Sequence, residues 1–205
     1  MLILDVPQLS TAWFEAKIGI PSASSFDRIV TTKGEPSKQR EDYLDELAAE
    51  IISGAKTETY QSYDMKDGIE KEPDARKLYE FINDVEVQQI GFCFYDEQRK
   101  YGSSPDGLVE IEGGLEIKKA KGRIQINRLR KGWSLAEHYQ QVQGNLFITG
   151  RKWWDLMSYS PSLPPLIIRF ERNEDFISKL KIELERFCFE LAEILVGAPF
   201  AGKLD

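Results

Sequence analysis

Residues 104–118 read Ser-Pro-Asp-Gly-Leu-Val-Glu-Ile-Glu-Gly-Gly-Leu-Glu-Ile-Lys, and the fold is organised around this stretch. It contains an acid in a Pro-Asp-Gly turn, a strand pattern, a Gly-Gly pair that predicts a second turn, and a further strand. Alternate side chains of a strand share a face, so Glu116 and Lys118 are expected to point the same way. Ile117 then points into the core, and its carbonyl oxygen is available as a ligand.

The position of the turn decides whether the two acids of this stretch can act together. If the hairpin turned symmetrically about Gly113 and Gly114, Glu116 would face Ile111. Asp106 would then lie five residues further along, roughly 16 Å away at ~3.3 Å per residue. A shared site therefore predicts a bend, a bulge or an asymmetric turn between Gly107 and Gly113.

The residue types indicate a metal site for phosphodiester hydrolysis. Asp106 and Glu116 supply the hard oxygen ligands that Mg²⁺ prefers, and Mg²⁺ keeps several waters. Lys118 beside them can orient or deprotonate a water, or stabilise charge that develops on a phosphate. The alternative is an exposed strand whose Glu and Lys form only a solvated face.

The chain is expected to form one α/β domain with a central mixed β-sheet flanked by helices. Its 205 residues and 41% hydrophobic content suit a single core. A helical part is expected over about 10–82 and a sheet-bearing core over about 85–172, followed by a C-terminal helix over about 174–195. Strand patterns occupy 85–96, 108–112, 115–120, 153–159 and 166–170, and helix patterns occupy 39–53, 64–82 and 134–149.

Charge is distributed unevenly along the chain. The net charge of -7 argues against a protein that binds nucleic acid over its whole surface. A basic run without acids nevertheless follows the candidate metal site: Lys118, Lys119, Lys121, Arg123, Arg128, Arg130 and Lys131. We expect this run to bind DNA phosphates, and the alternative is a solvated basic loop.

Other classes of protein are disfavoured. With two cysteines, no Cys-x-x-Cys and one histidine, the sequence does not indicate a zinc site or a disulfide framework. No apolar run approaches the ~20 residues of a membrane span. The N-terminus lacks the features of a signal peptide, so a cytoplasmic location is expected, in a host cell if the gene belongs to a phage.

Four motifs together carry a resemblance to a known family. They are Gly-Ile-Glu-Lys-Glu-Pro-Asp-Ala-Arg at 68–76, Ser-Pro-Asp-Gly-Leu at 104–108, Gly-Leu-Glu-Ile-Lys at 114–118 and Gln-Val-Gln at 141–143. With them, the chain from Trp13 to about Pro161 resembles the phage lambda-type exonucleases. This group includes alkaline exonucleases and YqaJ-like viral recombinase nucleases of the PD-(D/E)xK superfamily. The resemblance implies a restriction-endonuclease-like core.

The resemblance also implies roles for individual residues. Asp106, Glu116 and the Ile117 carbonyl match the metal ligands, and Lys118 matches the catalytic lysine. Glu72 matches a helix glutamate that contributes to a second metal, so two Mg²⁺ ions are implied, with Mn²⁺ as a substitute. Gln143 matches the glutamine of the helix that closes the site. The non-functional alternatives are that Glu72 only forms i,i+4 ion pairs on its helix and that Gln141 and Gln143 are ordinary polar residues.

A terminal 5′-phosphate site is implied near the N-terminus. Ser24 matches the family's serine in this segment, whereas Lys17 stands where the family commonly has arginine. Arginine binds phosphate bidentately and lysine acts as a point charge, so this departure puts the phosphate preference in doubt. Ser104 is expected either to touch phosphate or only to form its turn.

For function, the family implies 5′→3′ digestion of one strand of double-stranded DNA. It further implies a toroidal homotrimer around duplex DNA and coupling to a single-strand annealing protein. Two other readings stay open: an endonuclease of the same superfamily, and a non-catalytic scaffold that binds DNA ends.

Overall fold

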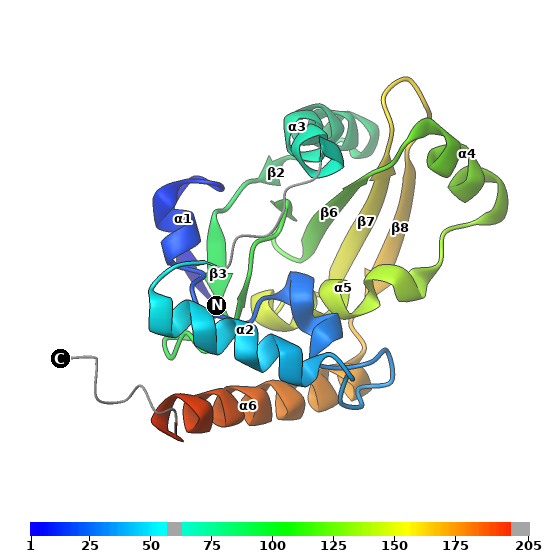
Figure 1. Cartoon of the computed structure of the whole chain (residues 1–205). Coiled ribbons are helices and arrows are strands. Elements are labelled where there is room, and N and C mark those ends of the chain that lie inside the picture. The colour runs from blue at the N-terminus through cyan, green and yellow to red at the C-terminus, as the bar shows by residue number, and fades with distance from the viewer. Residues whose placement is uncertain (57–62, 198–205) are drawn as a thin grey trace.

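The computed structural model describes residues 1–56 and 63–197 (Figure 1). The α-helices are α1 (Thr11–Glu15), α2 (Arg40–Ser53), α3 (Tyr63–Asn83), α4 (Gly122–Lys131), α5 (Tyr139–Thr149) and α6 (Glu174–Gly197), and the 3-10 helices are η1 (Ala23–Arg28) and η2 (Leu135–His138). The strands are β1 (Leu2–Leu4), β2 (Val87–Gln88), β3 (Phe92–Phe94), β4 (Gly102–Ser103), β5 (Gly107–Val109), β6 (Gly113–Lys119), β7 (Trp153–Tyr159) and β8 (Leu166–Glu171). No helix in these described ranges is long and apolar enough to cross a membrane.

A five-stranded sheet with the order β2-β5-β6-β7-β8 forms the centre of the molecule. β6 and β7 are parallel, and the other neighbouring pairs are antiparallel. The connection from β6 to β7 runs through α4 and α5, which supplies the long crossover that a parallel pair requires. The expected α/β class with a mixed sheet is therefore confirmed.

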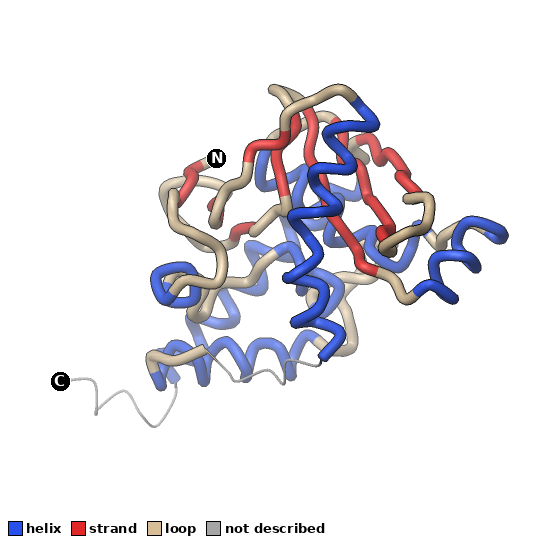
Figure 2. The backbone as a smooth tube through the Cα atoms, turned by 90° about the horizontal axis from the view of Figure 1, so that it is seen from above, coloured by secondary structure: helices blue, strands red, loops and turns tan. Residues whose placement is uncertain are grey.

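Helices cover both faces of this sheet. In Figures 1 and 2, α3 crosses one face, while α5 lies against the other and α2 and α6 lie behind it. Strand β7 shows the alternation that this requires. Trp154 and Leu156 pack into the core beneath α5, and Met157 and Tyr159 pack into the core beneath α3.

The strand expected over 85–96 is two strands in two different sheets. β2 is the edge of the five-stranded sheet, whereas β3 pairs with β1 and β4 in a separate three-stranded sheet. The chain passes from one sheet to the other through 89–91. Gly91 lies so close to the N-terminal segment that an added Cβ would come within 1.9 Å of the Val6 carbonyl oxygen. A contact with the far N-terminus therefore sets the break, which explains why the local pattern did not reveal it.

The hairpin turn lies between Gly107 and Gly113, as a shared site predicts, and not at the Gly-Gly pair. β5 pairs with β6 in the register Gly107↔Leu115, Leu108↔Gly114 and Val109↔Gly113, so the loop is Glu110–Glu112 and the Gly-Gly pair belongs to β6. No bulge or bend is needed, because this register continues to place Asp106 opposite Glu116. Arg151 fixes the turn by donating from Nη1 to the carbonyl oxygens of Val109, Glu110 and Gly113 at 3.0, 2.9 and 2.7 Å.

The two glycines serve packing rather than turning. An added Cβ would come within 2.1 Å of the Trp153 ring at Gly113 and within 2.2 Å of the Trp154 ring at Gly114. These residues are directly paired across the parallel β6–β7 ladder. The tryptophan rings therefore occupy the space that side chains on β6 would fill, and both positions require glycine.

The sequence patterns predict no element over 121–133, but most of this segment is helix α4. The helix extends from the end of β6 and stands out from the body in Figure 1. Its buried Gln125 anchors it by donating to the carbonyl oxygens of Ser158 and Pro164 at 3.2 and 2.7 Å. Four residues of the basic run, Arg123, Arg128, Arg130 and Lys131, thus lie on an anchored helix and not in a solvated loop.

Replacing Gly114 with alanine should destabilise the fold, because the new methyl group collides with a fully buried indole ring. We expect a loss of about 1–3 kcal/mol, the range for overpacked cores, measured by urea denaturation. Gly122→Ala is the matched control, since its nearest neighbour would lie at an ordinary 3.6 Å. Equal stability of the two variants would contradict the packing described for β6 and β7.

Candidate active site

The hairpin brings the two acids of the central stretch together. The backbone pairing of β5 with β6 ends at Gly107. Asp106, the residue before it, contacts β6 through its side chain instead of its backbone. Asp106 Oδ2 accepts a hydrogen bond from the Ile117 backbone N–H at 2.6 Å. The N–H and C=O of one strand residue point toward the same neighbouring strand, so the Ile117 carbonyl is directed to this side as well.

Glu116 is buried, at 4% exposure, and three hydrogen bonds fix its carboxylate. Lys118 Nζ donates to Oε1 at 2.8 Å, and Gln141 Nε2 donates to the same oxygen at 2.7 Å. Asn145 Nδ2 donates to Oε2 at 3.2 Å, and Lys118 also donates to Gln141 Oε1 at 2.9 Å. The expectation that Glu116 and Lys118 share a face is confirmed, and the N-terminal half of α5 closes over them.

The glutamine of this site is Gln141, and the placement expected for Gln143 is wrong. Gln143 is buried on another side of α5, where its Nε2 donates to the Glu171 carbonyl at 2.8 Å and its Oε1 accepts from the Asn173 N–H at 2.9 Å. Side chains two positions apart on a helix differ in direction by about 200°, so only one glutamine of the Gln-Val-Gln motif can face the carboxylates.

Asn145 is a residue of the site that the sequence reasoning missed. It is 1% exposed, and its Oδ1 accepts a hydrogen bond from Ser103 Oγ at 2.5 Å while its Nδ2 holds Glu116. A usable signal was present, because Gln141 and Asn145 are four residues apart and so share one helix face. Asn145 thereby connects the three-stranded sheet, through Ser103 on β4, to the buried carboxylate.

Glu72 approaches from α3 and pairs with Arg76 one turn further along. Arg76 is also buried and donates from Nε to the backbone oxygen of Asp106 at 3.3 Å. The simple i,i+4 pairing considered for Glu72 is therefore present, but the same arginine attaches α3 to the Asp106 turn. Arg76 belongs to the Glu-Pro-Asp-Ala-Arg motif, and sequence reasoning had assigned it no position in the site.

The acids repel one another in a poorly hydrated space. Burial raises the pKa of Asp106 well above its usual value, and the charges of Glu116 and Glu72 raise it further. The pKa of Glu72 is also raised, by burial and by Glu116, against the opposing effect of Arg76. Burial alone would lower the pKa of Lys118, but Glu116 and Asp106 outweigh it and the net direction is upward, so Lys118 carries a positive charge at neutral pH.

These residues fit a hard divalent cation. Within the described part of the chain, no three carboxylate, thiol or imidazole side chains converge into a complete metal cage. Mg²⁺ does not require one, because it commonly binds through one or two carboxylates and keeps its waters. Asp106, Glu116 and the Ile117 carbonyl supply such a set, and the mutual repulsion that raises the pKa of Asp106 is what a cation between the acids would relieve.

Of the residues expected to bind a terminal phosphate, Lys17 and Ser104 both contact Trp13. Lys17 Nζ lies 3.6 Å from the centre of the Trp13 ring, and burial together with Lys56 lowers the pKa of Lys17 to about 8. Trp13 Nε1 donates to Ser104 Oγ at 3.0 Å, and Ser104 donates in turn to the Gly91 carbonyl at 2.7 Å. Ser104 thus holds its turn in place, and Ser24 pairs with Ser22 at 3.1 Å between their hydroxyl oxygens.

The comparisons with known proteins identify the family of the chain. A family model described as the YqaJ-like viral recombinase domain matches residues 12–152, more than half of the chain. The chain belongs to the YqaJ-like viral recombinase family. The resemblance to lambda-type exonucleases is therefore confirmed.

Solved structures extend the match. The alkaline exonuclease LHK-Exo from Laribacter hongkongensis is 30% identical, with a TM-score of 0.83 over 96% of this chain and 100% of that chain. The structure of LHK-Exo in complex with dAMP gives the same values. A phage related exonuclease from Haemophilus somnus 129PT shares the fold at 13% identity, with a TM-score of 0.66 over 86% of this chain and 95% of that chain. No curated protein matches the chain.

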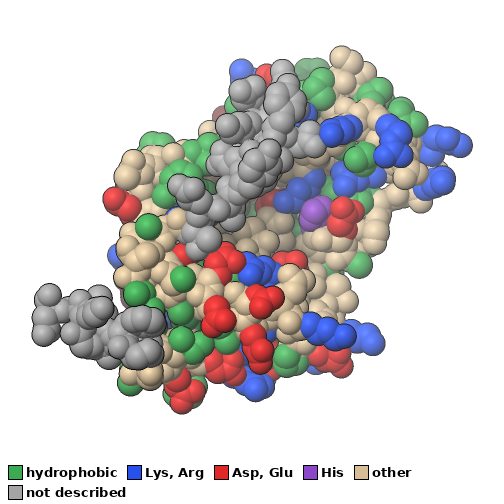
Figure 3. All heavy atoms as spheres, in the orientation of Figure 1, with side chains coloured by type: hydrophobic (Ala, Val, Ile, Leu, Met, Phe, Trp, Pro, Cys, Tyr) green, Lys and Arg blue, Asp and Glu red, His purple; other side chains and the backbone are tan. Residues whose placement is uncertain are grey.

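In this YqaJ-like domain the basic run is divided between structure and surface. Arg128 is held by Ser158 Oγ at 2.9 Å and stacks over Trp133, with its guanidinium carbon 3.9 Å from the ring centre. Arg123, Arg130 and Lys131 are exposed on α4. Figure 3 shows Lys and Arg side chains gathered over α4, while acidic side chains gather on the opposite part of this face, over α2 and α6.

Asp106→Asn should stabilise the metal-free protein at pH 8. A carboxyl whose pKa is raised by folding lowers stability as the pH rises above its unfolded value of ~3.9 and up to the folded value. The asparagine removes this cost, so its thermal midpoint in EDTA should exceed that of the unaltered protein by about 2 °C or more at pH 8. The difference should shrink as the pH falls toward 4.

The control for this measurement is Asp27→Asn, which removes an exposed acid on η1. It should not reproduce the pH-dependent gain. Excess Mg²⁺ should stabilise the unaltered protein and not Asp106→Asn, because a bound ion stabilises only a state that binds it. A lower midpoint for Asp106→Asn at pH 8 in EDTA would contradict the repulsion described for the site.

Alanine substitutions of Gln141 and Gln143 should lower the free energy of unfolding by different amounts. Gln143→Ala leaves the Glu171 carbonyl and the Asn173 N–H without their partner, and we expect it to cost about 1–3 kcal/mol. Gln141→Ala removes one donor from Glu116, which keeps Lys118 and Asn145 as partners, so its unfolding free energy should change by less than about 1 kcal/mol. Denaturant titration measures both, and the reverse order would show that the glutamines are assigned wrongly.

Proposed function

We propose that this YqaJ-like chain is a single nuclease domain that digests one strand of linear double-stranded DNA in the 5′→3′ direction, with Mg²⁺ as its cofactor. The product is a 3′ single-stranded overhang for recombination by strand annealing. The observation that supports this most directly is the β5–β6 register, which puts Asp106 beside Glu116 and the Ile117 backbone. The family and the name of LHK-Exo as an alkaline exonuclease point to the same chemistry.

In the proposed mechanism, Asp106, Glu116 and the Ile117 carbonyl would hold the ion, with Glu72 assisting a second one. A bound divalent cation supplies charge neutralisation and Lewis-acid activation at the scissile phosphate. Lys118 is held protonated by the neighbouring acids, so it positions the attacking water and stabilises negative charge that develops on the phosphate. Gln141 and Asn145 keep the Glu116 carboxylate in one orientation.

The DNA duplex is proposed to lie along the basic side of the molecule. Phosphate contacts come from Lys119, Lys121, Arg123, Arg130 and Lys131, while Arg128 supports α4 from beneath. Lys17 and Ser24 are the proposed contacts of a terminal 5′-phosphate. Because the pKa of Lys17 is about 8, its charge, and with it any preference for a phosphorylated end, should weaken above that pH.

The remaining parts of the proposal follow from the family. A homotrimeric ring would keep duplex DNA against the basic surfaces and away from the acidic exterior seen over α2 and α6 (Figure 3). A single-strand annealing protein would receive the overhang, and the place of action would be the cytoplasm, where the DNA is.

Digestion of a linear duplex labelled at either end tests the function. Mg²⁺-dependent release of mononucleotides from 5′ ends, with covalently closed circles left intact, is the expected result. Cleavage of the circle would favour an endonuclease, and binding of ends without any product would favour a scaffold. Parallel substrates with and without a 5′-phosphate measure the end requirement.

Lys118→Ala provides the mechanistic arm of the same assay. Removing the lysine's positive charge beside the scissile phosphate should lower the hydrolysis rate by about 10²–10³-fold. Binding of the duplex should persist in a gel-shift measurement. Lys152→Ala, an exposed lysine paired with Glu112 at the hairpin, is the control and should cut normally. An unchanged rate for Lys118→Ala would refute the assignment of this lysine.

A further inference from the structure

Tyr79 on α3, Asp155 on β7 and Arg169 on β8 form a chain of polar contacts that takes no part in the proposed mechanism. Tyr79 and Asp155 are buried, at 1% and 2% exposure. The Tyr79 hydroxyl donates to Asp155 Oδ2 at 2.7 Å. Arg169 donates to both oxygens of the same carboxylate, from Nε and Nη2 at 2.8 Å each. Both carboxylate oxygens are therefore satisfied, and the chain connects a helix to two neighbouring strands.

The strands hold Asp155 in one place. It is paired with Leu115 on β6 and with Arg169 on β8. The Arg169 guanidinium carbon lies 3.7 Å from the centre of the Trp153 ring, and this stacking restrains the arginine. Burial and the hydrogen bond to Asp155 raise the pKa of Tyr79, so its hydroxyl stays protonated and acts as the donor. The sheet thus presents a fixed acceptor to α3.

The apolar contacts of α3 with the sheet do not by themselves fix its position along the helix axis. They belong to a cluster that contains Ala75, Tyr79, Val109, Leu115 and Met157. Hydrophobic burial has no preferred direction, and a slide by one residue moves a helix only about 1.5 Å along its axis. A hydrogen bond is directional and is weakened by the same slide. The contact of Tyr79 with Asp155 therefore fixes the axial position of α3.

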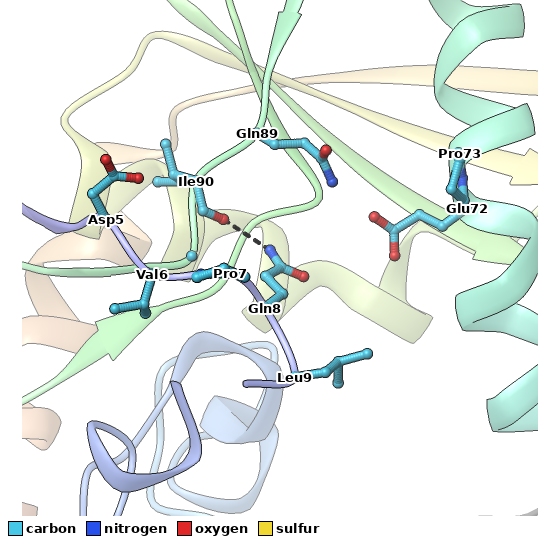
Figure 4. A pocket seen from close by; sticks show the side chains of 10 residues that line it. Asp5, Val6, Pro7, Gln8, Leu9, Glu72, Pro73, Gln89 and Ile90 are labelled. Atoms are coloured by element: carbon cyan, nitrogen blue, oxygen red, sulfur yellow. Dashed lines mark hydrogen bonds between the residues drawn. The ribbon is translucent and has the colours of Figure 1, made fainter. Parts of the chain in front are cut away.

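Glu72, Arg76 and Tyr79 are spaced i, i+4 and i+7, so they lie on one face of α3. An axial position that is set at Tyr79 is thus passed on to Glu72, two turns away. Pro73 removes a backbone hydrogen bond from the turn that contains Glu72, so this turn depends on the residues that follow it. Figure 4 shows the Glu72 side chain projecting from α3, beside Pro73, toward the segment that carries Gln8.

We propose that Asp155 is a positioning residue for Glu72, and that it acts through Tyr79. This inference rests on the proposed metal-dependent nuclease function and adds a residue of β7 to the determinants of that site. Asp106 does not share this dependence, because the Ile117 N–H on β6 holds its carboxylate at 2.6 Å. Loss of the contact between Tyr79 and Asp155 should therefore change the place of Glu72 and leave the rest of the site intact.

Tyr79→Phe tests the contact in the metal-free protein, since it keeps the ring in the core and leaves Asp155 bound by Arg169. In EDTA, amide hydrogen exchange of α3, including the turn with Glu72, should become about fivefold faster, the factor expected from one lost hydrogen bond. Tyr139→Phe is the matched control, because it removes a tyrosine hydroxyl on α5 that accepts from Asn173 at 2.9 Å. It should leave exchange in α3 unchanged. Unchanged exchange in Tyr79→Phe would overturn the proposal.

Thermal stabilisation by Mg²⁺ measures the effect on the site without catalysis. The Mg²⁺ concentration that gives half of the maximal stabilisation should rise about fivefold in Tyr79→Phe, because only molecules with α3 in place bind the ion at full affinity. Tyr139→Phe should match the unaltered protein. At saturating Mg²⁺, the single-turnover cleavage rate of Tyr79→Phe should approach the unaltered rate. Arg169→Lys is a second variant, which loses one of two hydrogen bonds to Asp155 and should shift the midpoint in the same direction by less.

A double-mutant cycle separates positioning from a general loss of stability. In a Glu72→Gln background, Tyr79→Phe should change the Mg²⁺ midpoint by less than about twofold, because the carboxylate that Tyr79 places is gone. A fivefold change that persists in this background would overturn the proposal, since Tyr79 would then act on the site by another route. If Mg²⁺ neither stabilises the unaltered protein nor supports cleavage, the proposed nuclease function fails instead. The exchange of the turn with Glu72 in EDTA then still decides whether Tyr79 and Asp155 position this residue.

Discussion

The register of the β5–β6 hairpin is the constraint on which the site depends. A slip of one residue would turn every side chain of one strand to the opposite face and separate Asp106 from Glu116. Two contacts from outside the hairpin prevent this. Arg151 binds three carbonyl oxygens at the turn, and the rings of Trp153 and Trp154 lie where side chains at Gly113 and Gly114 would be. The residues after α5 therefore fix the geometry of a turn that lies some forty residues earlier.

The segment that precedes Asp106 connects the site to the rest of the molecule. Ser103 donates to Asn145 on α5, Ser104 is held by Trp13 and Gly91, and Gln8 binds the Pro105 carbonyl. These three consecutive residues thus contact helix α5, the segment 89–91 that connects the two sheets, and the N-terminal segment, in that order. The position of the Asp106 carboxylate consequently depends on parts of the chain that contain none of the acids.

The sequence predicted local features well and long-range ones poorly. The mixed sheet, the long helices and the shared face of Glu116 and Lys118 follow from periodicity, which is a property of the residues themselves. Glycine pairs usually mark turns, yet Gly113 and Gly114 make room for tryptophans that β7 supplies, and the turn lies just before them at 110–112. The choice between Gln141 and Gln143 depends on the direction of α5 relative to β6, which the spacing alone does not contain.

The electrostatics of the site explain why so many neutral groups surround it. Glu116 is buried near two other acids; Arg76 pairs with Glu72, and Lys118 pairs with Glu116. Gln141 and Asn145 donate hydrogen bonds to the Glu116 carboxylate without adding a cation that would compete with a metal ion. The remaining repulsion falls on Asp106, whose pKa is raised. The fold therefore keeps one carboxylate fixed and leaves the other disfavoured in its charged form, and the proposed divalent cation would relieve this cost.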